Sequence, residues 1–330
     1  MADKKILLSV RDLKVHYPVK IHNKGFVAEK RVVRAVDGIS FDVYEGETLG
    51  IVGESGCGKS TTGRAIVRLN RPTSGQILYD GKDLYAYPKG EQDRLSKEIQ
   101  IIFQDPYSSL DPRFTVGRSI AEPLVVHRIG NAQERRQRVV ELMEEVGLRE
   151  DLYGRFPHEF SGGQRQRIGV ARALALNPRL LVCDEPVSAL DVSIQAQILN
   201  LMQELQKKHN LTYLFISHNL SVVEHVCVRI AVMYLGHIVE IASTEELFSH
   251  PLHPYTQALI QAVPVPDPER KSEHEPLGGD VPSPVNPPAG CPFCTRCPHA
   301  TERCRQERPV QADQGGGHLV SCHLYAKTNL

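Results

Sequence analysis

The chain has 330 residues, enough for one large domain with an appendage or for two modest domains. Of these residues 41% are hydrophobic and 24% are charged, as in ordinary globular proteins. Lys and Arg together number 39, as do Asp and Glu, and this zero net charge argues against a nucleic-acid-binding surface. No run approaches the ~20 apolar residues of a membrane-spanning helix, and the N-terminus does not resemble a signal peptide. We therefore expect a cytosolic protein with reduced thiols.

Two segments near the N-terminus alternate apolar and polar side chains. Residues 7–17 and 36–43 follow this period of two, which predicts two strands of an antiparallel sheet beside the main one. Residues 19–34 between them are basic and turn-like, and we interpret them as an insertion whose role the sequence leaves open.

A phosphate-binding pattern follows these segments. Residues 53–61 read GESGCGKST and match G-x-x-x-x-G-K-S/T at every fixed position. An apolar run precedes the pattern and a helix-length stretch follows it, so the helix N-terminus would add its partial positive charge. The lysine would contact the β- and γ-phosphates, and the serine hydroxyl would bind Mg²⁺. The predicted nucleotide-binding residues are Gly53, Glu54, Ser55, Gly56, Cys57, Gly58, Lys59, Ser60 and Thr61.

The pattern is helical from about residue 106 to residue 176. Val139, Leu142, Met143 and Val146 share one apolar face, and Gly147 is placed to cap that helix. We interpret the region as a helical subdomain inserted into the core.

Residues 160–167, FSGGQRQR, begin a further helix with Ser161, Gly162, Gly163 and Gln164. This cluster is either a plain N-cap or a second anion-binding helix end. One P-loop suffices for one nucleotide, so a second phosphate-facing helix end suggests a site shared between two subunits.

Apolar runs at residues 180–183, 213–216 and 230–233 suit buried parallel strands. The stripe Ile194, Ile198, Leu201, Met202 and Leu205 predicts a helix packed on a sheet between the first two runs. This alternation predicts an α/β fold with the P-loop at the carboxyl end of a central strand.

Two carboxylates follow the first of these runs. Asp184 would hold the Mg²⁺ shell, and Glu185 would polarise the attacking water as the catalytic base. Exposed carboxylates commonly end strands, but here they complete a P-loop site.

The composition changes near residue 250. Residues 251–288 contain ten of the 22 prolines, too many for helices or central strands, which predicts an extended arm. Cys291, Cys294, Cys297, Cys304 and Cys322 follow the arm. In a reducing compartment such clustering indicates a metal site, either structural zinc or a 4Fe–4S cluster, because C-x₂-C-x₂-C is a ferredoxin-type run. We expect two regions, residues 1–250 and 251–330.

Over about residues 5–245 these motifs resemble the ATP-binding-cassette (ABC) ATPases. Residues 160–164 are similar to the signature motif of that family, in the form FSGGQ. Gln104 matches the Q-loop glutamine, which in the family senses Mg²⁺ and the γ-phosphate and couples to the transmembrane partner. His218 resembles the switch histidine, and Tyr17 stands where the family has an aromatic that stacks on adenine.

The resemblance implies an α/β P-loop ATPase fold with an antiparallel β subdomain and an inserted helical subdomain, followed by an irregular, cysteine-rich C-terminal extension. It also implies that two cassettes meet head to tail, with ATP on one P-loop covered by the Ser-Gly-Gly helix of the other. Since both halves of this chemistry are present, we expect a catalytically competent ATP hydrolase.

Residues 103–117, 247–259 and 290–300 resemble the oligopeptide and dipeptide importers of this family, and the whole chain resembles an ATPase subunit of dipeptide permeases. This resemblance implies a heterodimer with a sister ATPase, two membrane permease subunits and an extracytoplasmic peptide-binding protein. It places the chain on the cytoplasmic face of the inner membrane. Related importers carry longer peptides or nickel, so the exact cargo stays open.

For the tail, the resemblance makes Cys294 the spare thiol, and the softness of the donors favours a 4Fe–4S cluster over zinc. The expected ligands are Cys291, Cys297, Cys304 and Cys322. A second class of function, a cassette ATPase acting in DNA repair or on ribosomes, is disfavoured because the chain has one cassette, no heptad insertion and no net positive charge.

Overall fold

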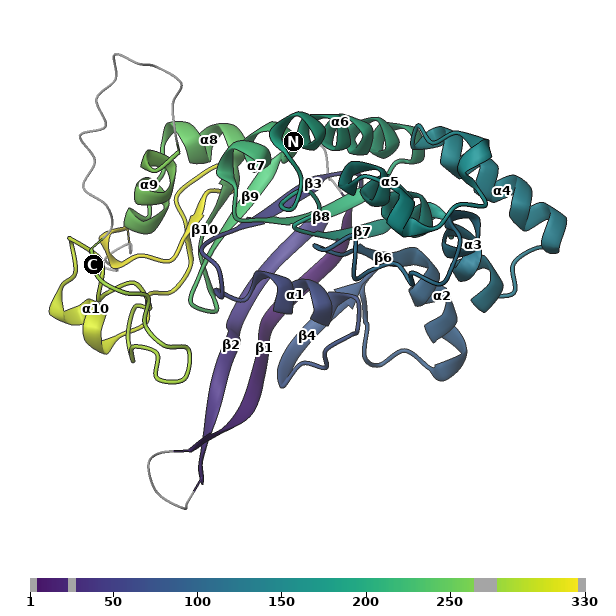
Figure 1. Ribbon diagram of the computed structural model, residues 1–330. Coiled ribbons are helices and arrows are strands. Elements are labelled where there is room, and N and C mark those ends of the chain that lie inside the picture. Colours follow the sequence, from purple (N-terminus) through teal and green to yellow (C-terminus); the bar gives the residue numbers. More distant parts are fainter. Residues whose placement is uncertain (1–4, 23–27, 264–277, 326–330) are drawn as a thin grey trace, which may run out of the picture. The chain divides into compact units, whose positions relative to one another are not determined.

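The computed structural model describes residues 5–22, 28–263 and 278–325 (Figure 1). The chain divides into two compact units, which we describe separately. The first comprises residues 1–5, 43–48 and 84–216, and the second comprises residues 6–42, 49–83 and 217–330, each without the undescribed positions. None of the described helices is long and apolar enough to cross a bilayer.

The first unit contains a parallel sheet of three strands. β7 (Leu180–Asp184) pairs with β6 (Ile99–Ile102) on one side and with β8 (Thr212–Ser217) on the other. Every residue of β7 and β8 is buried, which confirms the prediction of buried parallel strands from their continuous apolar runs.

Helices occupy the rest of the first unit, and its described part has no strand between residues 103 and 179, as predicted. The Asn131 side chain caps α4 with a capping box, and Gly147 follows the last turn at φ +72°, as a C-terminal glycine should. The predicted stripe of α6 is buried from Ile198 onward. The helices are α2 (Gln92–Glu98), α3 (Val116–Val126), α4 (Ala132–Glu145), α5 (Gly162–Leu174) and α6 (Val192–His209), with short 3-10 turns at Lys89–Glu91, Glu150–Leu152 and Pro157–Glu159.

The second unit contains the predicted antiparallel sheet, in the order β2 (Ala28–Tyr44), β1 (Ile6–His22), β4 (Ser74–Tyr79), β5 (Lys82–Asp83). The turn-like interpretation of residues 19–34 is wrong at both ends, because β1 runs to His22 and β2 starts at Ala28, while residues 23–27 lie outside the described part. Most of the described side chains at these strand ends are exposed, so no apolar face marks them in the sequence.

A second sheet of this unit carries the phosphate-binding motif. β3 (Thr48–Val52) pairs in parallel with β9 (Arg229–Tyr234), which pairs with the antiparallel β10 (His237–Ser243). Beyond β10 follow β12 (Leu319–Val320) and β11 (Ala312–Asp313) from near the C-terminus. The helices of this unit are α1 (Lys59–Ile66), α7 (Leu220–Val226), α8 (Thr244–Ser249), α9 (Pro254–Gln261) and α10 (Glu302–Gln306), with a 3-10 turn at His323–Tyr325.

One carboxylate fastens the later chain to β10. Glu240 is fully buried and accepts hydrogen bonds from the backbone N–H groups of Leu252 and His253 at 2.7 and 2.9 Å. Its Oε1 lies 2.6 Å from Nε2 of His318. The charge is therefore paired with donors from two segments that follow β10.

The proline-rich arm is not wholly extended. Residues 254–261 form α9, which corrects the prediction that prolines exclude helices here. Pro254 occupies the first helical turn, where a missing N–H costs nothing, and the His253 side chain accepts from the Tyr255 N–H. The arm residues 264–277 lie outside the described part.

Candidate functional site

The residues of the predicted P-loop form a tight loop between β3 and α1 in the second unit. Gly53, Gly56 and Gly58 all have positive φ, the region that glycine enters without a Cβ penalty. A Cβ on Gly53 would lie 2.0 Å from the Met233 carbonyl oxygen, and one on Gly58 would lie 2.2 Å from that of Ala35. The glycines thus allow neighbouring backbone to approach the loop closely.

Lys59 closes the loop on itself. Its Nζ donates to the carbonyl oxygens of Gly53 at 2.8 Å and Glu54 at 3.0 Å, and the residue is 4% exposed. The ammonium group is therefore held inside the ring of backbone that would surround phosphate oxygens. Burial raises the pKa of the neighbouring Cys57 thiol, which keeps it protonated.

Three contacts hold Glu54, the second residue of the loop. Its N–H donates to the Tyr255 hydroxyl at 3.0 Å, and its carbonyl oxygen accepts from Lys59. Its carboxylate accepts from Nη1 of Arg296 at 2.9 and 3.1 Å. The P-loop motif did not reveal Tyr255 or Arg296; both lie in the segments 247–259 and 290–300 that resemble the importers, but that resemblance gave no contact with the loop.

Tyr17 and His218, two further predicted site residues, also belong to the second unit. Tyr17 lies on β1, is 38% exposed, and accepts a hydrogen bond from the Asn70 amide at 2.8 Å. The ring is accessible for stacking and is oriented by a residue that closely follows α1. His218 follows β8 directly and is exposed.

The first unit brings Gln104 and Glu185 together. Nε2 of Gln104 donates to Oε2 of Glu185 at 2.9 Å; Gln104 is exposed and Glu185 is partly exposed. Glu185 follows the buried Asp184 at the end of β7 and has φ +49°, an uncommon conformation for a non-glycine residue. Its N–H donates to the Ile216 carbonyl, and this strand-end pairing helps to hold the conformation.

The predicted signature residues start α5, also in the first unit. Ser161 Oγ accepts from the Gln164 N–H at 3.3 Å, and Gln164 Oε1 accepts from the Ser161 N–H at 3.0 Å. A Cβ on Gly163 would lie 2.4 Å from Ile194 of α6, so the helix start packs closely on its neighbour. Gly162 lies between Ser161 and Gly163 as the first residue of α5. The structure therefore forms the capping box, and the role toward phosphate stays a prediction.

The five cysteines of the tail lie near one another. Burial raises the pKa of Cys291 to about 12, and the charges of Cys322, Cys304 and Cys294 add to this effect. The Cys291 N–H donates to the Cys304 carbonyl at 2.8 Å. Even so, no three His, Cys, Asp or Glu side chains of the described residues stand in positions to hold a metal ion. The ligand set that includes Cys297 therefore gains no support from this geometry.

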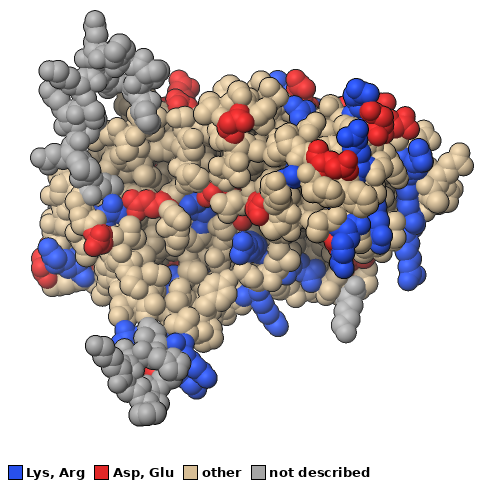
Figure 2. All heavy atoms as spheres, viewed as in Figure 1, with Lys and Arg blue, Asp and Glu red and all other residues tan. Residues whose placement is uncertain are grey.

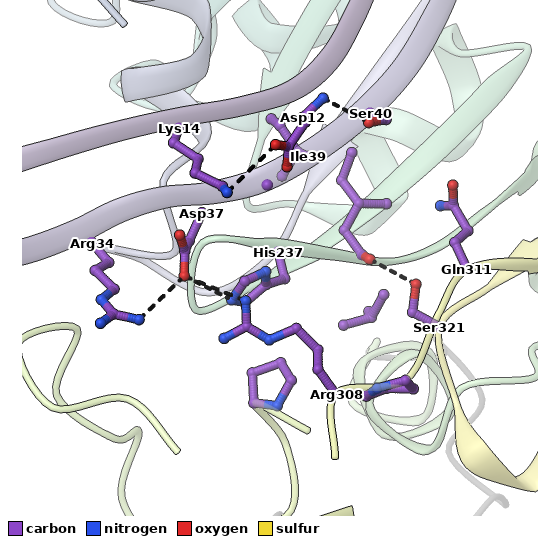
Figure 3. Close-up of a pocket in the computed structure, with 15 residues that line it drawn as sticks. Asp12, Lys14, Arg34, Asp37, Ile39, Ser40, His237, Arg308, Gln311 and Ser321 are labelled. Atoms are coloured by element: carbon purple, nitrogen blue, oxygen red, sulfur yellow. Dashed lines mark hydrogen bonds and ion pairs between the residues drawn. The ribbon is translucent and has the colours of Figure 1, made fainter. Parts of the chain in front are cut away.

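A polar cavity of about 440 Å³ lies elsewhere in the second unit, and its lining includes no P-loop residue (Figure 3). At its wall Asp37 contacts Arg34 and Arg308, with N–O distances of 3.7 and 3.4 Å, and Nε2 of His16 at 3.0 Å. Burial alone would raise the pKa of Asp37, but these partners outweigh it and lower the pKa. The buried carboxylate is thus neutralised by its own neighbours.

Two family models match the chain. The model described as "ABC transporter" matches residues 36–188, and the model "Oligopeptide/dipeptide transporter, C-terminal region" matches residues 239–304. The first match contains the P-loop, and the second contains Tyr255 and Arg296, which contact it.

Figure 2 shows basic and acidic side chains interspersed on the face in view, in keeping with the net charge of zero.

Relatives match over almost the whole length. The chain is 53% identical to "Putative oligopeptide transport ATP-binding protein YkfD" of Bacillus subtilis, covering 97% of this chain and 95% of that protein. It is 49% identical to "Dipeptide transport ATP-binding protein DppF" of Haemophilus influenzae, covering 96% of each. Among solved structures, the ATP-binding cassette MJ0796 in a dimeric post-hydrolysis state with ADP and Pi superposes with a TM-score of 0.62 at 27% identity, covering 72% of this chain and 98% of MJ0796.

Proposed function

Because the chain belongs to the ABC transporter ATP-binding proteins and carries the C-terminal region of their oligopeptide/dipeptide branch, we propose that it hydrolyses ATP to drive import of dipeptides or short oligopeptides across the bacterial inner membrane. The observation that carries the proposal is the P-loop with its inward-facing Lys59, in a chain that matches such proteins from end to end.

The site residues receive these proposed roles. The loop residues Gly53–Thr61 bind the triphosphate, and Ser60, Gln104 and Asp184 hold Mg²⁺. Glu185 orients and deprotonates the attacking water, and the hydrogen bond from Gln104 supports this role because it holds the carboxylate in place. His218 contacts the γ-phosphate and Tyr17 stacks on adenine.

We propose that two cassettes share each nucleotide, with the α5 N-terminus covering the ATP of a sister ATPase. The dimeric state of the structurally similar MJ0796 supports this arrangement. Two permease subunits and an extracytoplasmic peptide-binding protein complete the assembly, and the chain lies on the cytoplasmic face of the membrane.

We also propose the division of the chain into a cassette at residues 1–250, with its helical part at about 106–176, and an extension at 251–330. In the extension, the spacing of the thiols supports a 4Fe–4S cluster bound by Cys291, Cys297, Cys304 and Cys322, with Cys294 as the spare, although the thiols would have to move into ligating positions. Brown protein with iron and sulfide would establish the cluster, and colourless protein with one zinc per chain would establish the alternative.

The decisive experiment is purification of the membrane complex with its binding protein, followed by ATPase assays with peptides of defined length. Stimulation by dipeptides supports the dipeptide proposal, and stimulation only by longer peptides or nickel assigns another cargo of the same branch. Co-purification with membranes that persists after permease deletion would contradict the transport function.

A further inference from the structure

The C-terminal segment, residues 278–325, reaches the P-loop through one arginine. The Arg296 side chain is 7% exposed, and its Nη1 contacts both carboxylate oxygens of Glu54, at 2.9 and 3.1 Å. The two residues are 242 positions apart in the sequence. A charged pair that is largely withdrawn from water and hydrogen-bonded is stronger than an exposed one.

An aromatic cluster fixes the position of this arginine. Phe293 packs against Tyr234 and Tyr255, with ring centroids 5.2 and 5.4 Å apart, and all three side chains are fully buried. The Arg296 N–H donates to the Phe293 carbonyl at 3.0 Å, which closes a tight turn. Tyr255, in turn, binds the Glu54 N–H. The same cluster therefore supports the carboxylate and the backbone of one P-loop residue.

The charge of Glu54 gives this contact a consequence for nucleotide binding. A carboxylate beside the residues that bind a triphosphate repels the phosphates unless a cation neutralises it. Arg296 is that cation: it contacts the Glu54 carboxylate, whereas Lys59 binds the backbone carbonyl oxygens of Gly53 and Glu54.

We propose that Arg296 is a positioning residue of the P-loop, which neutralises Glu54 and fixes the loop, so that the C-terminal segment sets the affinity for ATP. This inference rests on the proposed function, since it requires ATP to bind at residues 53–61. The segment then acts on the nucleotide site of its own chain, a role that the description "Oligopeptide/dipeptide transporter, C-terminal region" does not state.

The test measures equilibrium binding of a fluorescent ATP analogue and steady-state kinetics on the full chain in its complex. For R296A we expect the Kd and KM for ATP to rise about tenfold with kcat nearly unchanged, as for loss of one charge-assisted contact. R296K retains the charge and restores part of the affinity. The matched control is R303A, because Arg303 lies in the same segment but pairs with Glu307 on the exposed surface.

A double-mutant cycle separates this role from folding of the segment. Because E54Q removes the charge that Arg296 neutralises, R296A should raise Kd in the wild-type background and leave it unchanged in the E54Q background. An equal loss in both backgrounds, or no loss in either, would overturn the inference. Failure of the wild-type chain itself to bind the analogue would instead reject the proposed function.

Discussion

The P-loop and the Gln104–Glu185 pair are both expected to face ATP, yet they are held very differently. The P-loop is fixed by Lys59 from within, by close backbone contacts at Gly53, and by Tyr255 and Arg296 from the later chain. Gln104 is exposed, Glu185 is partly exposed, and the two side chains share a hydrogen bond of 2.9 Å. The difference teaches that the P-loop, the binding half of the site, is fixed by backbone carbonyls and by residues far along the chain, whereas the Gln104–Glu185 contact, the hydrolytic half, joins two polar side chains that follow β6 and β7.

Replacing Glu185 with Gln gives the largest expected effect and tests whether the hydrolytic half acts separately. Turnover should fall at least about a hundredfold, since a general base contributes that much, while ATP binding is preserved. Single-turnover hydrolysis and binding of an ATP analogue check this, with Glu144→Gln on the exposed face of α4 as the control. Retained turnover would remove Glu185 as the base.

Replacing Gly53 with Ala tests the rigidity of the binding half. The added Cβ would meet the Met233 carbonyl at 2.0 Å, so the loop must shift, and we expect ATP affinity to fall at least about tenfold. Gly56→Ala is the matched control, because its Cβ would meet nothing within 4 Å and only the positive φ would be strained. Equal losses for the two variants would show that close packing is unimportant.

Replacing Gln104 with Ala removes the one side-chain contact between the predicted sensor and the predicted base. We expect turnover to fall about tenfold, because the Glu185 carboxylate loses the hydrogen bond that Gln104 donates to it. ATP affinity should change little, because the P-loop contacts are unaffected. Parallel measurement of kcat and Kd checks this, and Gln137→Ala on exposed α4 is the control. A loss of affinity equal to the loss of turnover would contradict the separation of the two halves.

Replacing Tyr17 with Ala should give the smallest effect, an increase in Kd for ATP of about fivefold, as for loss of one stacked base at an accessible ring. Tyr17→Phe keeps the ring and loses only the bond from Asn70, so its affinity should stay near that of the wild type. Inorganic triphosphate should bind both variants alike, because it has no base. Equal weakening of ATP and triphosphate would exclude stacking.

Much of the fold could be predicted because its signals are local. The P-loop residues are adjacent in the sequence, the strands β7 and β8 are continuous apolar runs, and Gly147 directly follows the helix it caps. The P-loop NTPase fold with an antiparallel sheet and inserted helices is confirmed by the structure and by its likeness to solved cassettes.

Other features could not be predicted, for physical reasons. The strand extensions to His22 and from Ala28 lack a buried face, so no hydrophobic period marks them. The sequence predicts that Pro254 interrupts helical structure, but it occupies the first turn of α9, where a helix tolerates proline. The contact of Arg296 with Glu54 joins residues 242 positions apart, and a single sequence carries no signal for such a pair.

Glu240 has a consequence for the synthesis of this protein. Its buried charge is satisfied only when residues 252, 253 and 318 have reached it, and β12 can pair with β10 only then. The second unit combines the beginning of the chain with its end, so the ribosome must deliver nearly the whole polypeptide before this unit can close. Completion of this unit is therefore a late event, and a chain that ends before residue 318 would leave Glu240 with the Leu252 and His253 N–H donors but without its His318 partner.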